Sequence, residues 1–304
     1  MSIVVIGSSN TDMIIQVPRI PKPGETIIGG KFSMAAGGKG ANQAVAAARA
    51  GGEVALIARV GQDMFANEAI SGFRNDGIDT SCLVRDSQAP SGVAEIFVAE
   101  NGENSIAVAS GANMNLSEED IRKAENVITK ATIVLMQLEI PLDSVIFAAR
   151  TACQAGKKVI LNPAPAQPLP DDLYKNISVI TPNESEAELL TGINVTDEKS
   201  AGKASKVLLE KGAGAVIVTL GAKGSFVMNR EWHALIPGYP VKAVDTTAAG
   251  DVFSGVLAVG LGEGRSLKEA VRFATAAAAL SVTRLGAQPS APQRDEILRF
   301  LKEN

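Results

Sequence analysis

Two short apolar runs, Ile133-Val134-Leu135-Met136-Gln137 and Lys158-Val159-Ile160-Leu161-Asn162, enclose a stretch of helical spacing from Leu142 to Ala155. Continuous apolar runs of this kind are typical of strands buried on both faces, and a helix between two of them is the crossover unit of a parallel sheet. The alternation extends in both directions along the chain. It predicts further strands at Ile3–Gly7, Val54–Arg59, Ser178–Thr181 and Ala215–Thr219, and further helices at Gly40–Ala50, Met64–Asp76, Glu184–Thr191, Glu198–Lys211, Ala249–Gly262, Ser266–Thr283 and Gln293–Lys302. The sequence therefore predicts an α/β fold, with three layers around a doubly wound, mainly parallel sheet.

Two segments, Asp12–Ala36 and Val93–Ala109, interrupt this alternation with short strands and turn residues but no helix. Each lies within the strand–helix repeat rather than after its last element. We therefore predict a single α/β domain over residues 1–304, with a small antiparallel β lid inserted at about residues 12–36 and 93–109.

The composition excludes several classes of function. The chain has 29 Lys and Arg against 33 Asp and Glu, with no basic block, which disfavours a nucleic-acid partner. The longest apolar stretch, Phe273–Val282, is shorter than the roughly 20 residues that span a bilayer, so it predicts a buried helix and no membrane partner. Cys82 and Cys153 lie outside any CxxC pair and are expected to be reduced and mostly buried. His233, the only histidine, is expected to serve surface or packing roles, and the amino terminus lacks a basic leader, which favours the cytoplasm.

The strongest candidate site is the segment from Val244 to Gly255, with the sequence VDTTAAGDVFSG. It indicates a strand end, a tight turn and a helix whose first turn contains Asp251. The amides of Ala249, Gly250 and Asp251 would converge at the helix N-terminus, where unpaired donors favour an anion. A carboxylate beside such a hole can accept the proton of a hydroxyl that attacks phosphorus there. The alternative is that Asp251 is only an N-terminal helix acid and Gly250 only a turn residue.

Three further segments are weaker candidates. In Ala36–Ala44 a glycine run enters a helix with Lys39 and Asn42, which suits a ligand or a turn with a solvated lysine, but matches neither a dinucleotide fingerprint nor a Walker A loop. Thr219–Gly224 could wrap a polyphosphate or form a plain β-turn. Asn183 and Glu186 lie one helical turn apart and could face a metal-bound water, or only compensate the helix dipole.

Taken together and in this order, these segments resemble the ribokinase/PfkB family of carbohydrate kinases over essentially the whole chain. Gly37–Ala44 (GGKGANQA) is similar to the amino-terminal signature of the family, and Asp245–Asp251 (DTTAAGD) to its carboxy-terminal signature. Within the family, the likeness is greatest to the members that phosphorylate D-ribose. It is carried by Gly7–Asp12, Met136–Glu139, Asn162–Pro165, Thr181–Glu184 and Gly286–Ser290.

The resemblance implies transfer of the γ-phosphoryl group of MgATP to the 5-hydroxyl of D-ribose. By the same resemblance, Asp251 is the base and the amides of Ala249 and Gly250 form the anion hole. The sugar would be held by Asn10, Asp12, Gly38, Lys39, Asn42 and Glu139. The nucleotide would meet Asn183, Thr219, Gly221, Gly224, Gly250 and Thr275, with Glu186 on the Mg²⁺ side. At Thr275 a larger polar residue can occur in the family, which leaves the adenine contacts less defined.

The resemblance also implies activation by K⁺ and a homodimer formed through the lid. The matching cation positions are Asp245, Thr247, Ser281, Arg284, Gly286 and Ser290, mostly through backbone oxygens.

Two alternatives to this function stay open. One is a deoxyribokinase or another small-sugar or nucleoside kinase of the family; the amide of Asn10, which could pair with a 2-hydroxyl, favours ribose. The other is a non-catalytic sugar-binding or nucleotide-binding regulator on the same fold, which the presence of Gly250, Asp251 and Glu186 disfavours.

Overall fold

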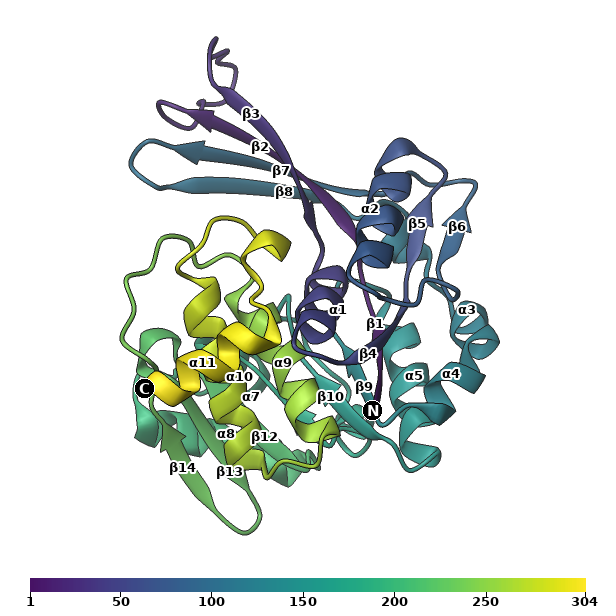
Figure 1. The fold of residues 1–304 in the computed structure, drawn as a ribbon, viewed down its shortest axis with the longest axis vertical. Coiled ribbons are helices and arrows are strands. Elements are labelled where there is room, and N and C mark those ends of the chain that lie inside the picture. Colours follow the sequence, from purple (N-terminus) through teal and green to yellow (C-terminus); the bar gives the residue numbers. More distant parts are fainter.

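The computed structural model describes residues 1–304 and contains a main sheet of eight strands (Figure 1). The strands lie in the order β14-β13-β12-β11-β10-β9-β1-β4. Six are parallel: β1 (Ser2–Ile6), β4 (Glu53–Ile57), β9 (Ile133–Met136), β10 (Lys158–Leu161), β11 (Val179–Ile180) and β12 (Ala215–Thr219); β13 (Ser225–Asn229) and β14 (His233–Ile236) add an antiparallel edge. The chain passes from β1 to β4 and then returns to the other side of β1 for β9. Folds of this kind bind ligands at the carboxyl ends of the strands near such a reversal.

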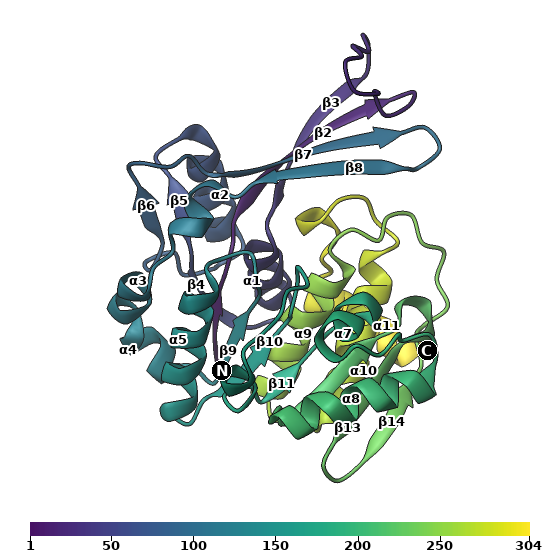
Figure 2. The same cartoon turned by 180° about the vertical axis from the view of Figure 1, so that it is seen from behind.

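Helices cover both faces of the main sheet, and the alternation of side chains along each strand supplies two cores. In β1, Ile3 and Val5 belong to one core, and Val4 and Ile6 to the other. The first face carries α1 (Lys39–Arg49), α9 (Ala249–Gly262), α10 (Leu267–Ser281) and α11 (Arg294–Glu303). The second carries α3 (Glu118–Lys123), α4 (Glu125–Lys130), α5 (Leu142–Gln154), α6 (Asp171–Tyr174), α7 (Glu184–Thr191) and α8 (Glu198–Lys211), seen from behind in Figure 2. The predicted three-layer α/β fold is confirmed.

A second sheet of four strands projects from the main body (Figures 1 and 2). It contains β2 (Asn10–Val17), β3 (Lys31–Gly37), β7 (Gly92–Ala99) and β8 (Asn104–Ala109) in the order β3-β2-β7-β8. The outer pairs are antiparallel as predicted, but the central pair, β2 and β7, is parallel. The two strands run in the same direction because both leave the main body at the base of this second sheet. We call this sheet the lid.

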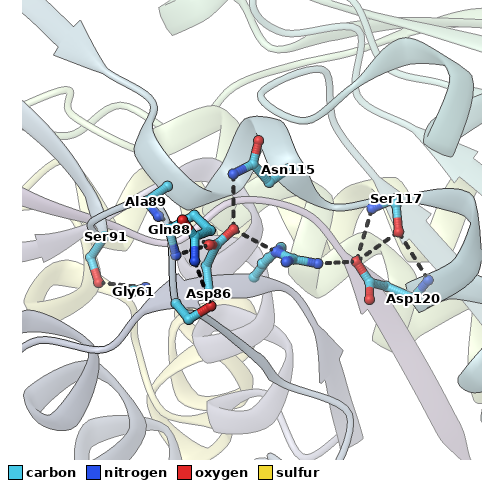
Figure 3. A network of polar contacts seen from close by, with 10 residues as sticks. Gly61, Asp86, Gln88, Ala89, Ser91, Asn115, Ser117 and Asp120 are labelled. Atoms are coloured by element: carbon cyan, nitrogen blue, oxygen red, sulfur yellow. Dashed lines mark hydrogen bonds and ion pairs between the residues drawn. The ribbon is translucent and has the colours of Figure 1, made fainter.

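A small parallel sheet at the base of the lid was not predicted. It pairs β5 (Arg59–Gly61) with β6 (Val84–Asp86) and packs against α2 (Met64–Asn75). Figure 3 shows the polar network that fixes it: Arg59 bridges Asp86 and Asp120, and Asn115 donates to Asp86. Ser91, directly before β7, accepts from the Gly61 amide and donates to Asp63. The network therefore anchors the start of β7 to the main body.

Some sequence predictions need correction. The strand predicted at Val54–Arg59 ends at Ile57, because the chain leaves the main sheet there and Arg59 begins β5. Cys153 is exposed and Cys82 only partly buried, so the expectation of mostly buried thiols is wrong. The α3–α4 region was missed, although Ser117 and Asp120 form a capping box at its start. No helix is long and apolar enough to cross a membrane.

Candidate active site

The start of α1 lies directly against the end of β1, and glycines make this approach possible. A Cβ at Gly40 would lie 2.5 Å from the Ser8 amide nitrogen and 2.6 Å from the Gly7 carbonyl carbon. Gly38, which precedes the helix, has a φ of 88°, in the region that favours glycine. The glycine run is therefore required by the chain itself, and it places Lys39 and Asn42 at the carboxyl end of the sheet.

The turn before α9 leaves backbone amides unpaired, as the predicted anion hole requires. Ala248 adopts a φ of 59°, rare for a residue with a Cβ, and the helix begins at Ala249. The amide of Ala249 is partly engaged, donating to the Thr246 carbonyl at 3.3 Å, whereas the Gly250 and Asp251 amides donate to no protein acceptor. The donors open to an anion are thus those of Gly250 and Asp251, with Ala249 beside them.

Asp251 is buried in the first turn of α9, with only 6% of its surface exposed. Asn42 Nδ2 donates to Asp251 Oδ2 at 3.0 Å, and Gln43 Nε2 donates to Oδ1 at 2.9 Å. Burial raises the pKa of Asp251, and the positive charge of Lys39 with these two amide donors opposes the rise. The carboxylate is therefore a desolvated base held by donors on both oxygens.

Lys39 lies among carboxylates. Burial lowers its pKa, but the charges of Asp251, Glu139 and Glu186 together raise it above the usual value. Glu139 Oε2 accepts the Lys39 amide at 3.0 Å and the Ser8 hydroxyl at 2.5 Å, so this carboxylate caps the N-terminus of α1. Lys39 is thus kept cationic at the centre of the site.

Asn10 and Asp12 begin the lid strand β2 and lie on the same face of it. Burial, with the charges of Glu139 and Asp251, raises the pKa of Asp12 to about 6. Asn113, from the 3₁₀ turn η1 (Gly111–Asn115), accepts the Ser9 amide on Oδ1 and donates from Nδ2 to Asn10 Oδ1 at 2.7 Å. The Asn10 amide therefore turns its oxygen to Asn113 and keeps its NH₂ group, which donates to no protein atom, for another acceptor.

A cavity of about 180 Å³ lies between Lys39 and Asp251 on one side and residues predicted to meet the nucleotide on the other. Seven predicted residues line it: Lys39, Asn183, Glu186, Thr219, Ala249, Gly250 and Asp251. Asn183 and Glu186 also form the capping box of α7, the Glu186 carboxylate accepting the Asn183 amide at 2.9 Å and its Nδ2 at 3.0 Å. Burial raises the pKa of Glu186, although the Asn183 hydrogen bond and Lys39 oppose the rise.

Three predicted nucleotide residues lie outside the lining of this cavity. Gly221 belongs to the 3₁₀ turn η2 (Gly221–Lys223), after Thr219. Gly224 serves the backbone, because a Cβ there would lie 2.1 Å from the Ile236 carbonyl oxygen. Thr275 is buried in α10, and its hydroxyl donates to the Val271 carbonyl at 2.8 Å.

The predicted cation residues lie in the loop before α9 and in the segment that runs from the last residue of α10 to the 3₁₀ turn η3 (Gln288–Ser290). Asp245 joins the loops, since its carboxylate accepts the Thr247 amide at 2.9 Å and the Gly286 amide at 2.8 Å. Burial raises the pKa of Asp245, but these hydrogen bonds outweigh it and lower the value. Ser281 and Ser290 are buried with their hydroxyls bonded to nearby carbonyls, and the Arg284 side chain pairs with Glu296.

Four buried amide side chains near Asp251 or Asn10 were missed from the sequence. Gln43, Gln137 and Asn162 lay inside quoted motifs or predicted strand ends, but were given no role, and Asn113 lay in an unassigned segment. All four are at least 94% buried. No spacing in the sequence reveals Gln43, Gln137 and Asn162, because these three meet only where α1, β9 and β10 converge beside α9. Asn113 lies apart from them, in η1 against Asn10.

The whole chain matches known carbohydrate kinases. A family model described as pfkB family carbohydrate kinase covers residues 1–294. The chain belongs to this family. It is 51% identical over 301 residues to the ribokinase of Haemophilus influenzae, covering 99% of this chain and 98% of that protein. It is 39% identical to the deoxyribokinase of Salmonella typhi over the full length of both. A solved structure of Arabidopsis thaliana ribokinase, complexed with ribose and ATP, superposes with a TM-score of 0.92 at 35% identity, covering 99% of this chain and 98% of that one.

The raised pKa of Asp12 predicts an acid limit to sugar use by this kinase. Protonation near pH 6 removes an acceptor from the site, so kcat/KM for the sugar should fall as the pH drops through about 6. Measuring kcat/KM between pH 4.5 and 9 checks this. Asp12→Asn is the control, which should lose the acid limb near pH 6; a wild-type midpoint near 4 would contradict the assignment.

Proposed function

We propose that this carbohydrate kinase transfers the γ-phosphoryl group of ATP to the 5-hydroxyl of D-ribose. The observation that carries the proposal is the position of Asp251, whose carboxylate contacts the Asn42 and Gln43 amides while its own N–H lies at the open anion hole of α9. The identity to ribokinases over the whole length of the chain supports the same substrate.

In the proposed reaction, Asp251 accepts the proton of the 5-hydroxyl as the hydroxyl oxygen attacks the γ-phosphorus. The bond from phosphorus to the β,γ-bridging oxygen breaks, and ADP leaves. The Gly250 and Asp251 amides hold the transferring phosphoryl oxygens, and Lys39 balances the charge. A Cβ at Gly250 would meet nothing within 4 Å, so the packing of the chain does not require glycine there. The absence of a side chain would instead leave space for the ligand.

The residues on the nucleotide side fit a Mg²⁺ ion carried by ATP. Mg²⁺ keeps several waters and binds through one or two carboxylates and the phosphates. Glu186 supplies one buried carboxylate in the cavity, with the Asn183 amide beside it, and no cluster of three acidic, His or Cys residues forms a protein cage. When bound, the ion neutralises the phosphate charge, and Glu186 with Asn183 would orient its water shell.

The orientation of Asn10 favours ribose over deoxyribose. Its NH₂ group is kept free by Asn113 on the lid face that carries Asp12, where a sugar hydroxyl can accept from it. A sugar without that hydroxyl would leave the donor unpaired. A deoxyribokinase is the second candidate because a relative of that activity is 39% identical.

We propose that K⁺ binds at the Asp245 loops. The support is a charged carboxylate that ties the loops of Thr247 and Gly286 together directly beside the turn of Ala248 and Gly250. A cation held there by backbone oxygens would stabilise the amide orientation of the anion hole. Arg284, Ser281 and Ser290 complete the proposed set.

We further propose that the lid closes over the sugar as part of one kinase domain and joins two chains into a homodimer. Strand register puts Ala94 and Val108 on the face of Asp12, where they would exclude water from the sugar. On the opposite face Phe32 is 61% exposed and Met34 44% exposed, an apolar surface that a second lid would cover. The cytoplasm, where ATP is available, is the proposed location.

The function is tested by ADP release with D-ribose and with 2-deoxy-D-ribose. We expect sugar-dependent turnover with a higher kcat/KM for ribose, and a loss in kcat of about 10²–10⁴-fold in Asp251→Asn with little change in ribose affinity by calorimetry. An equal or higher kcat/KM for deoxyribose would indicate the deoxyribokinase. Binding without sugar-dependent ADP release would indicate the regulator.

The same assay tests the cation site. Turnover should rise in KCl and rise much less in NaCl at equal ionic strength. Na⁺ is smaller than K⁺ and would fit poorly among backbone oxygens spaced for K⁺. Asp245→Asn should lose most of the KCl response. Equal rates in the two salts would contradict the proposed K⁺ site.

The dimer is tested by the mass of the native protein in solution, from sedimentation equilibrium. We expect twice the chain mass of 31.5 kDa, and a shift to the monomer in Phe32→Glu, which places a charge on the exposed lid face. A monomeric native protein would contradict the assignment.

A further inference from the structure

Gln43 is fully buried in α1, and its amide makes three hydrogen bonds behind the catalytic carboxylate. Its Nε2 donates to Asp251 Oδ1 at 2.9 Å and to Asn162 Oδ1 at 3.0 Å. Its Oε1 accepts from Gln137 Nε2 at 2.6 Å. Every hydrogen-bonding group of this side chain is therefore used, and the mechanism above gives it no role.

Only one orientation of the Gln43 amide satisfies these partners. Asn162 Nδ2 donates to the main-chain carbonyl of Thr181 at 3.2 Å, and a carbonyl can only accept. Asn162 must then turn its oxygen to Gln43, so that Gln43 presents its NH₂ group to both Asn162 and Asp251. A flipped amide would set an oxygen against two acceptors, Asn162 Oδ1 and Asp251 Oδ1. The backbone at the end of β11 thus fixes a donor toward Asp251.

The packing of α9 on α1 holds this contact. Gly255 lies one turn after Asp251 on α9, and a Cβ there would come within 2.5 Å of the Gln43 carbonyl oxygen. The two helices therefore approach at backbone distance where Gln43 meets Asp251. The donor and the carboxylate have little freedom to separate.

We propose that Gln43 is a positioning residue for phosphoryl transfer, which, with Asn42, fixes the plane of the Asp251 carboxylate so that a free lone pair faces the sugar hydroxyl. This inference rests on the proposed role of Asp251 as the base. Gln43 acts through Asp251 and need not touch either substrate.

The charges around Asp251 do not replace this contact. Lys39 from α1 attracts the carboxylate, whereas Glu139 after β9, Asp12 on β2 and Glu186 on α7 repel it. These charges act over distance and do not select a plane for the carboxylate. Two amide donors, one on each carboxylate oxygen, select that plane.

The test compares Gln43→Met, Gln43→Glu and Gln137→Met with the wild type in kcat, KM for D-ribose and the pH profile of kcat. Gln43→Met removes the donor, and we expect kcat to fall about 100-fold, with KM changed less than about threefold and the acid limb of kcat moved to higher pH. Gln137→Met keeps both donor bonds of Gln43 and should show a smaller loss in the same direction. Gln167→Met is the matched control, since Gln167 makes a single 3.4 Å contact to the Leu138 carbonyl, and it should leave kcat unchanged.

Gln43→Glu separates positioning from general damage. Ionised, the new carboxylate would repel Asp251, but protonated it can donate to Asp251 Oδ1, so its activity relative to wild type should rise as the pH falls. A pH profile unchanged from wild type, or a kcat of Gln43→Met within twofold of it, would overturn the inference. Should Gln43→Met fail to fold, as judged by its melting temperature, Gln43→Glu and Gln137→Met decide.

Combining Gln43→Met with Asp251→Asn distinguishes the inference from the proposed function. A positioning residue has nothing left to position once the base is lost, so the double variant should be no slower than Asp251→Asn alone. A further loss equal to that of Gln43→Met would contradict the inference. Full turnover in Asp251→Asn would instead overturn the proposed base, whatever Gln43 does.

Discussion

The removal of the Asp251 carboxylate from water is the constraint on which the site depends. A buried carboxylate tends to take up a proton, and a protonated Asp251 could not act as a base. Lys39 opposes protonation by its charge, and Asn42 and Gln43 by one donor on each oxygen. All three come from the first turns of α1, so the position of that helix decides whether the base is charged. The glycine run before α1 and the packing of α1 against α9 serve this requirement.

The glycines of the two family signatures and of the helix α9 that follows the second therefore have different physical causes. Gly40 and Gly255 are needed by the chain, since a Cβ at either would lie 2.5 Å from a backbone atom of a neighbouring element. A Cβ added at Gly250 would have no neighbour within 4 Å, and the residue has an ordinary backbone conformation. The folded chain would therefore accept a side chain there. Its surroundings leave space beside open amides, which is what a transferring phosphoryl group requires. Some of these glycines therefore allow two segments of the chain to approach closely, and Gly250 leaves space where the ligand would lie.

The sequence predicted the layers of the fold because apolar runs and helical spacing are local signals. It missed β5 and β6, since three-residue strands carry no period, and it could not foresee that β2 and β7 run parallel, which depends on where both leave the body. Of the candidate site, the residues in glycine-rich turns and at helix starts could be predicted from their motifs. Gln137 and Asn162 ended predicted strands without a sign of function. A buried amide has meaning only through its partners, and those of Gln43 lie 94, 119 and 208 residues away.

The two halves of the site have opposite chemistry, and Asp251 lies at their boundary. On the proposed sugar side, burial together with the charges of Glu139 and Asp251 raises the pKa of Asp12 to about 6, and this group of carboxylates suits a neutral alcohol that donates hydrogen bonds and disfavours a phosphate. On the nucleotide side, the unpaired amides of α9 favour an anion, and Lys39 lies between the halves, attracted by Asp251, Glu139 and Glu186. A sugar that gains a phosphate becomes an anion next to carboxylates, whereas the unmodified sugar does not. In the proposed reaction, the charges that face the alcohol would therefore favour departure of the phosphorylated product.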